Sequence, residues 1–376
     1  MVGESQCGER SLREWVRGGC EAECAHECES ARGGCAIGEE AVCGARGEHG
    51  ATVASTGRTL SIPNMRVSSK VRWPELLGAG ARVALVCGSG PLRGAEDVER
   101  AEGHVRVCGW EPVRGLSVLQ RRGYLAGSDA ERLRDLQWAL DDDSIDGVWC
   151  VRGGYGMTRI LPAVSLAKFA ERPKAVIGYS DVTALHCAVA ARAGVVTFHS
   201  HTARAVMPAM SEVSVRSAVL RSGEPCGVWN DAHRVRGGCV EGRLAGGNLS
   251  LLAAVCGTRD AMVGDGAIVV LEDIGEASYR VDRMLRQLEQ AEVFRGCVGL
   301  AVGQFTQVPA DESEDALTIG ELVEELAQRL NVPCLSNLPI GHIADQWTLP
   351  LGAAAVLDVE GRSLTVAGSF PSALTN

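Results

Sequence analysis

From about Trp73 onward, short apolar runs alternate with segments that have the spacing of amphipathic helices. The runs ARVALV, DGVWCV, KAVIG and VVTF are separated by helical patterns that include DAERLRDLQWALDDD, ILPAVSLAKFAE and DVTALHCAVAARA. Strands that alternate with helices of this length are typical of βαβ units, in which neighbouring strands pair in parallel. The sequence therefore predicts an α/β fold that begins with a domain built on a parallel sheet.

The C-terminal part alternates less regularly. It contains the strand AIVVLED, the helical patterns SYRVDRMLRQLEQA and TIGELVEELAQRL, and a final series of short strands with turns. This mixture predicts a second, smaller domain with a mixed sheet. The expected boundaries are an N-terminal α/β domain at 71–210, a polar linker at 211–237, and a C-terminal domain at 238–376.

Residues 1–70 are rich in Gly, Glu, Arg, Ser and Cys and have few apolar positions at a regular spacing, so we expect a disordered extension. The spacing of Cys20, Cys24 and Cys28 is wider than the C-x2-C pair of zinc knuckles, so we expect no metal there. The remaining cysteines lie mostly in apolar runs such as VALVC and LAAVC, which favours reduced, buried thiols.

Charge and hydropathy exclude several classes of protein. The formal net charge of −10 argues against non-specific binding of nucleic acid, which requires clustered Lys and Arg. No apolar run reaches the roughly 18 residues of a membrane span, and the charged first 30 residues lack the apolar core of a secretory signal. We therefore expect a cytoplasmic protein with small or peptidic partners.

The segment AVIGYSDVTAL, residues 175–185, places Ser180 between a strand and a helix. A serine there can be a nucleophile at the C-terminal edge of the sheet, or it can cap the helix. Val182 stands where the G-x-S-x-G motif has its second glycine. Position alone leaves both interpretations open.

Two glycine-rich segments also follow apolar runs. The loop RGGYG, from Arg152 to Gly156, permits close approach of its backbone N–H groups to a substrate oxygen, although a tight turn explains it equally well. No Lys-Ser/Thr pair follows, which excludes a P-loop. GSGPLRG is one residue too long for the dinucleotide fingerprint, so a nucleotide-dependent oxidoreductase has little support.

Two further polar residues are candidates for an acid and a base. Glu272 ends the apolar run AIVVLE, and His342 lies in the loop of LPIGHIADQ. With Ser180 they follow the order of a nucleophile, an acid and a base that some serine hydrolases use, but spacing does not show that they meet. His199 and His201 lack partners at the spacing of a metal site.

Several blocks together resemble the LD-carboxypeptidases, the serine peptidase family that also contains the microcin C immunity peptidases. The resemblance extends over about residues 73–372 and rests on the segments GYLAGSDAERLRDLQWAL, VRGGYGMTRILP, KAVIGYSDVTALH, GGNLSLLAAVCGT, LEDIGEASYRVDRMLRQL and PIGHIADQWTLPLGA. It implies two α/β domains with the active site between them. A small departure is FHSHTA, where the family pattern has histidine followed by Gly-Pro.

The resemblance implies that Ser180 is the nucleophile, that Glu272 and His342 complete the triad, and that the backbone N–H groups of Asp181 and Gly154 form the oxyanion hole. It also implies a cytoplasmic homodimer that needs no metal or organic cofactor. The expected reaction removes the terminal D-alanine from a muropeptide tetrapeptide, at an L-to-D bond, during peptidoglycan recycling. Two alternatives stay open: an immunity-type peptidase that cleaves a peptidyl-nucleotide antibiotic, and a non-catalytic protein that binds wall peptides.

Overall fold

The computed structural model describes residues 71–310 and 315–366, so the extension predicted at residues 1–70 lies outside the described residues. The first sheet has the strand order β12-β5-β4-β3-β1-β2. Its strands β1 to β5 pair in parallel, which confirms the parallel sheet predicted from the sequence. The strands are β1 (Arg82–Val86), β2 (Glu111–Arg114), β3 (Gly147–Cys150), β4 (Ala175–Gly178), β5 (Thr197–His199) and β12 (Leu349–Leu351).

The helices of this region connect the parallel strands, as βαβ topology requires. Helix α2 begins where the sequence predicts, because Ser128 caps it and Glu131 completes a capping box with Ser128. The buried side chains of Leu136 and Leu140 face the core from this helix. The helices are α1 (Ala95–Val107), α2 (Asp129–Asp141), α3 (Met157–Ile160), α4 (Ala167–Glu171) and α5 (Thr183–Ala193).

The segment ILPAVSLAKFAE, predicted as one helix, is broken into three short pieces. Helix α3 ends at Ile160, a 3-10 turn follows at Leu161–Ala163, and α4 begins only at Ala167. Pro162 has no backbone N–H to donate, and Val164 is extended with φ −66° and ψ 126°. The apolar residues whose spacing suggested one helix are instead buried from α3, the 3-10 turn and α4 separately.

The second sheet is mixed and has the order β6-β14-β13-β8-β9-β10-β11-β7, which confirms the class of fold predicted for the C-terminal part. Strands β8, β9, β10 and β11 pair in parallel, and the strands at both edges are antiparallel. The strands are β6 (Gly227–Val228), β7 (His233–Arg236), β8 (Cys239–Asn248), β9 (Ala267–Ile274), β10 (Gly299–Thr306), β11 (Cys334–Ser336), β13 (Ala354–Asp358) and β14 (Ser363–Val366).

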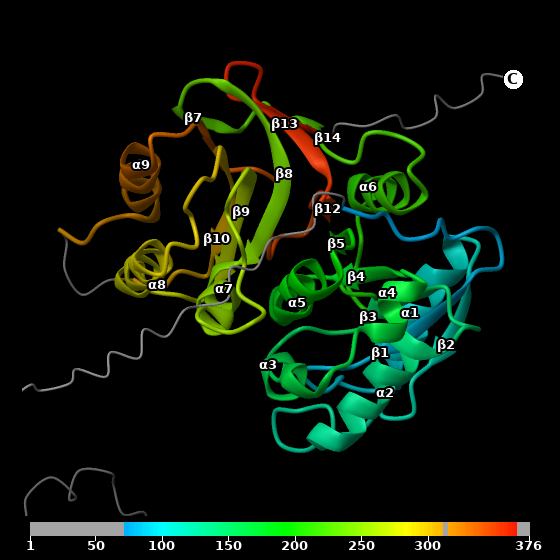
Figure 1. Ribbon diagram of the computed structural model, residues 1–376. Helices are drawn as coiled ribbons and strands as arrows, with labels where there is room; N and C mark the ends of the chain where they lie inside the picture. Colours follow the sequence, from blue (N-terminus) through cyan, green and yellow to red (C-terminus); the bar gives the residue numbers. More distant parts are fainter. Residues whose placement is uncertain (1–70, 311–314, 367–376) are drawn as a thin grey trace, which may run out of the picture. The chain divides into compact units, whose positions relative to one another are not determined.

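Three helices accompany this sheet, and Figure 1 shows α8 and α9 beside each other next to its strands. Two hydrogen bonds from Arg329 of α9 to Glu289 of α8, at 2.9 and 3.0 Å, join these two helices. Helix α7 contacts α8, which follows β9 of the second sheet, and α5, which follows β4 of the first sheet. The helices are α7 (Leu249–Val255), α8 (Ser278–Gln290) and α9 (Ile319–Leu330).

The segment 211–237, expected to be a linker, contains regular structure. Most of α6 (Ala209–Leu220) lies in it, and that helix buries Val215, Ala218 and Val219. Strands β6 and β7 follow and become edge strands of the second sheet. The polar composition that suggested a linker reflects the exposed face of a helix and two edge strands.

Strand β12 joins the first sheet although it comes from the C-terminal part of the chain. Its Leu349 is opposite His199 of β5, and the two strands are antiparallel. One apolar cluster also includes Leu185 of α5 and Leu252 of α7. The two sheets therefore share a core, and the C-terminal part of the chain contributes one strand to the first sheet.

Among the described residues, none of the helices combines the length and the apolar character that crossing a bilayer requires. The cysteines of the described residues are free, and several are buried as the sequence suggests. Burial raises the pKa of the Cys150 and Cys187 thiols to about 12, so these two cysteines stay protonated and act as small apolar side chains.

Candidate active site

Ser180 lies on a sharp turn between β4 and α5. Tyr179 is extended, whereas Ser180 has a φ of 63°, in the left-handed region that non-glycine residues rarely adopt. Neither the 3-10 turn at Ser180–Val182 nor α5 has a side-chain capping bond, so Ser180 is not the helix cap considered from the sequence. A strained serine at the C-terminal end of a parallel strand has the local geometry of a nucleophile turn.

The glycine-rich loop after β3 lies against this serine. A Cβ placed on Gly153 would be 2.9 Å from the Cβ of Ser180 and 3.0 Å from its Oγ. Gly154 has a φ of 108° and contacts Gly90, whose N–H donates to the carbonyl of Gly153 at 3.0 Å. Within this loop the backbone of Gly153 lies against Ser180, and Gly154, the donor predicted from the family resemblance, is the next residue.

Asp181 connects the serine turn to the same loop through its side chain. Its Oδ2 accepts the backbone N–H of Met157, at the start of α3, at 2.8 Å. Burial raises the pKa of the Asp181 carboxyl, against the opposing effect of this hydrogen bond. The residue predicted to supply a backbone N–H therefore also holds the end of the glycine-rich loop.

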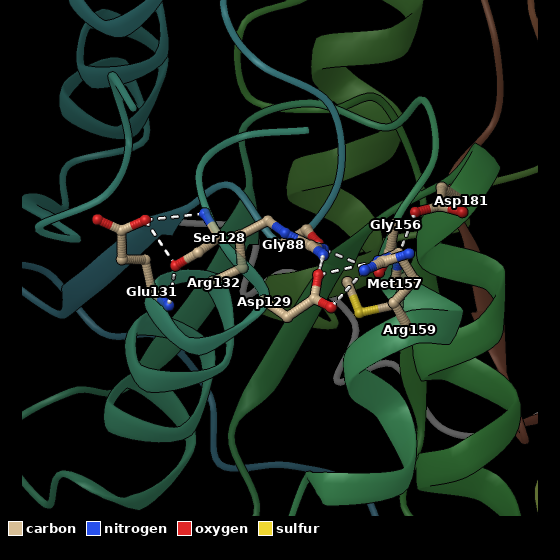
Figure 2. Close-up of polar contacts among 9 residues, drawn as sticks. All are labelled: Gly88, Ser128, Asp129, Glu131, Arg132, Gly156, Met157, Arg159 and Asp181. Carbon is tan, nitrogen blue, oxygen red and sulfur yellow. Dashed lines mark hydrogen bonds and ion pairs between the residues drawn. The ribbon is translucent and has the colours of Figure 1, made fainter. Parts of the chain in front are cut away.

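The buried guanidinium of Arg132 fixes the two glycine-rich segments together (Figure 2). It donates to the carbonyl of Gly156 at 2.8 Å and to the carbonyl of Gly88. Asp129 accepts from Arg132 and, at 2.9 and 2.6 Å, from Arg159. The bonds from Arg159 are the main reason that the pKa of Asp129 falls to about 2. Arg132 was not predicted as a site residue, because an arginine on an amphipathic helix is usually exposed on the surface.

Glu272 and His342 form a direct pair. The Nδ1 atom of His342 is 2.8 Å from Oε2 of Glu272, whose side chain is fully buried on β9. Burial raises the pKa of Glu272, and the hydrogen bond from His342 opposes that effect. A carboxylate at Nδ1 holds the proton on that nitrogen, which leaves Nε2 as the basic nitrogen of the ring.

The residue before His342 is suited to this arrangement. Gly341 has a φ of 112°, and a Cβ at this position would lie 2.8 Å from Oε2 of Glu272. The carboxylate therefore occupies the space that any other side chain would need.

Tyr179 connects the Glu272–His342 pair with the turn that carries Ser180. Its ring centroid is 4.7 Å from that of His342, and Ser180 is the next residue in the chain. Glu272 and His342 thus interact directly, and Ser180 follows the tyrosine that contacts His342. Asp181 is the next residue after the serine, and Gly154 follows Gly153 in the loop that lies against it. The same tyrosine ring also contacts His199 and His201 at centroid distances of 5.9 and 6.1 Å.

These two histidines differ from each other. His199 is fully buried and neither ring nitrogen has a hydrogen-bond partner, and burial keeps its pKa well below the ordinary value. His201 has partners on both nitrogens. Within the part of the chain that the structure describes, no group of three or more His, Cys, Asp or Glu side chains is arranged to hold a metal ion.

Comparison with known proteins assigns the chain to a class of protein. Residues 83–200 match the LD-carboxypeptidase N-terminal domain, and residues 241–357 match the LD-carboxypeptidase C-terminal domain. The chain is 35% identical to the murein tetrapeptide carboxypeptidase of Pseudomonas aeruginosa, over 78% of this chain and 97% of that protein. These matches place it among the peptidases. The chain belongs to the LD-carboxypeptidase family.

Solved structures agree with this fold. The muramoyltetrapeptide carboxypeptidase of Oxalobacter formigenes has a TM-score of 0.68 and 29% identity, over 78% of this chain and 100% of that one. The microcin C7 self-immunity protein MccF in complex with glutamyl sulfamoyl guanosine has a TM-score of 0.71 and 21% identity, over 80% of this chain and 99% of that one. At that identity, the second likeness concerns the fold alone.

Proposed function

We propose that the chain is a serine carboxypeptidase in which Ser180 is the nucleophile, His342 the general base and Glu272 the residue that orients the base. The observation that carries this proposal is the 2.8 Å hydrogen bond between Glu272 and His342, next to a strained serine turn. Nε2 of His342 takes the hydroxyl proton of Ser180 as its Oγ attacks the peptide carbonyl. The same proton then goes to the leaving amine, and water hydrolyses the acyl-enzyme.

The developing oxyanion requires N–H donors near Ser180. The backbone N–H of Asp181 lies at the start of a 3-10 turn that leads into α5, where the helix dipole favours negative charge. The second donor comes from the loop at Arg152–Gly156, and Gly154 is the donor proposed from the sequence. The hydrogen bond from Met157 to Asp181 and the contacts of Arg132 support the fixed shape that such a site needs.

The proposed substrate is a murein tetrapeptide, cleaved at its L-to-D bond with release of D-alanine during peptidoglycan recycling. The name of the Pseudomonas relative, at 35% identity, supports this choice over the antibiotic substrate of the microcin self-immunity protein of Escherichia coli, at 23%. Family resemblance also leads us to propose a cytoplasmic homodimer. Light scattering of the purified protein tests the oligomeric state, and a monomer would contradict that part.

Release of D-alanine from a small set of stem peptides tests the proposed activity. A panel of tetrapeptides with different third residues, a peptide whose last residue is L-alanine, and an aminoacyl sulfamoyl nucleotide separates the two peptidase functions. We expect release from the tetrapeptides and loss of it in Ser180→Ala. Cleavage of the nucleotide conjugate alone would favour the immunity function.

A serine-reactive phosphonate separates an enzyme from a binding protein of the same fold. We expect one adduct, located on Ser180 by mass spectrometry of the digested protein. A folded protein that binds the tetrapeptide but stays unlabelled would be the non-catalytic wall-peptide receptor instead.

A further inference from the structure

His342 lies on a stretch without regular secondary structure, between β11 and β12. Its hydrogen bond to Glu272 fixes only one atom of the ring. Contacts of the surrounding loop must therefore determine where Nε2 points. Ser211 of α6 holds this loop at Asp345 and at the backbone N–H of Gln346. Two further points of contact are the buried side chain of Gln346 and the carbonyl of Ala344.

His201 makes both of these contacts from the edge of the first sheet. Its Nδ1 is 3.0 Å from Nε2 of Gln346, and its Nε2 is 3.2 Å from the carbonyl oxygen of Ala344. Only 3% of His201 is exposed, and Nε1–H of Trp149 donates to its backbone carbonyl at 2.8 Å. The imidazole therefore projects from a rigid support.

The partners of His201 determine its tautomer. The amide nitrogen of Gln346 can only donate, so Nδ1 of His201 accepts and Nε2 carries the proton that is donated to Ala344. Burial lowers the pKa of His201 to about 4, so the ring is neutral near pH 7. A neutral ring with this tautomer satisfies both bonds at once.

Gln346 connects His201 to Gly341, the residue before His342. Its Oε1 accepts the backbone N–H of Gly341 at 3.3 Å, while its amide nitrogen is bound to His201. Gly341 is packed against the carboxylate of Glu272. A change at His201 would therefore reach His342 through two hydrogen bonds and one peptide unit.

A second route passes through an aromatic ring. Tyr179 packs edge-on against His201, with an interplanar angle of 82°, and its centroid is 4.7 Å from that of His342. Ser180 follows directly in the chain. The His201 ring thus contacts both the loop of the base and the residue before the nucleophile.

We propose that His201 is a positioning residue that holds the His342 ring in line with Ser180, through Gln346 and Tyr179. This inference rests on the proposed function of Ser180 and His342. The ring belongs to FHSHTA, the segment in which the resemblance to the family leads us to expect Gly-Pro at Ser200 and His201.

Three variants separate the contacts of His201. His201→Asn keeps an acceptor for Gln346, because its Oδ1 replaces Nδ1, but it loses the donor to Ala344. His201→Phe keeps a ring against Tyr179 and loses the hydrogen bonds to Gln346 and Ala344, together with the 3.3 Å contact between Nε2 and Oγ of Ser211. Gln346→Ala leaves His201 in place and removes the link to Gly341. The matched control is His104→Phe, since Nδ1 of His104 meets the carbonyl of Ala203 at 2.7 Å, close to the same loop of the first sheet.

The measurements are kcat and KM for D-alanine release, the rate of phosphonate labelling at Ser180, and the thermal midpoint. We expect His201→Phe and Gln346→Ala to lose about 10- to 100-fold in kcat, with KM within about threefold, as for a displaced catalytic group. The labelling rate should fall in parallel. His201→Asn should recover most of both rates, and the control should match the wild type.

Each other outcome contradicts the proposal. Folded variants that turn over and label at wild-type rates would show that the anchorage does not position the base. A raised KM with unchanged kcat would make His201 a substrate contact instead. If His201→Phe does not fold, the rates of Gln346→Ala and His201→Asn show whether His201 positions the His342 ring.

Labelling does not depend on the peptide, so the two proposals fail differently. Normal labelling without D-alanine release would reject the proposed substrate and leave the test of His201 intact. A wild-type protein that is not labelled at Ser180 would reject the nucleophile, and the inference about His201 with it.

Discussion

Seventy residues separate Glu272 from His342 in the sequence, yet Oε2 of the first lies 2.8 Å from Nδ1 of the second. Glu272, the proposed acid, is on β9 in the second sheet, and His342, the proposed base, is on the loop that leaves that sheet for β12. Their contact means that the His342 ring is oriented by a carboxylate that water does not reach.

Glu272→Gln should preserve the volume of the side chain and abolish its charge. An amide no longer holds the Nδ1 proton in the required way, so we expect kcat to fall by about 10²- to 10⁴-fold. Steady-state release of D-alanine measures this. Glu276→Gln is the control, because Glu276 has only a 3.7 Å surface ion pair with Arg280. Activity of Glu272→Gln equal to that of the control would mean that the carboxylate does not orient the base.

Gly153→Ala should displace Ser180, the proposed nucleophile. The added methyl carbon would lie 2.9 Å from the Cβ of Ser180, closer than van der Waals contact allows. We expect a loss of at least about tenfold in kcat and of about 1–3 kcal/mol in unfolding free energy, the usual cost of overpacking. The matched control is Gly78→Ala, which meets nothing within 4 Å. The kcat of each variant and its unfolding in urea are measured. Equal kcat values for the two variants would contradict the close approach of Gly153 to Ser180.

Ser180→Gly should be more stable than Ser180→Ala. The φ of 63° costs a residue with a Cβ about 1 kcal/mol or more, and glycine adopts this conformation freely. The greater chain entropy of unfolded glycine offsets part of the gain, so we expect a difference of about 1 kcal/mol. Urea denaturation of the two inactive variants measures it. A less stable glycine variant would argue against strain at the nucleophile.

The carboxyl of Asp181 should make stability depend on pH. Burial raises its folded pKa, so its favourable contribution is complete below the unfolded pKa of about 4 and is lost as the pH rises through the folded value. Asp181→Asn keeps an acceptor for Met157 and does not titrate. We therefore expect the wild type to lose stability relative to Asp181→Asn as the pH increases. Urea midpoints of both proteins across this range test the sign, and a constant difference would contradict the raised pKa.

Local sequence patterns predicted the elements that carry the candidate site, because each depends on neighbouring residues. The apolar run at Ala175–Gly178 is β4, and α2 begins at Asp129, as the helical pattern DAERLRDLQWALDDD indicates. The pattern failed at ILPAVSLAKFAE, where Pro162 and the extended Val164 interrupt the helix, and at α6, whose exposed polar face suggested a linker.

The sequence indicated which residues could form the candidate site, but it did not indicate how they are arranged in space. Ser180, Glu272 and His342 each stand at the end of an apolar run or in a loop, and that much is visible in sequence. Gly153, Arg132 and Gln346 are different, because their importance comes only from contacts with residues far along the chain. Conformational strain at Ser180 likewise has no signature in the sequence.

Strand β12 has a consequence for dividing this chain into pieces. It covers the outer edge of β5, so a fragment that ends before the second sheet would leave the backbone groups of β5 unpaired. Exposed strand edges of this kind recruit other chains and promote aggregation. Although the sequence matches two separate domain families, expression of the N-terminal half alone should yield a self-associating protein.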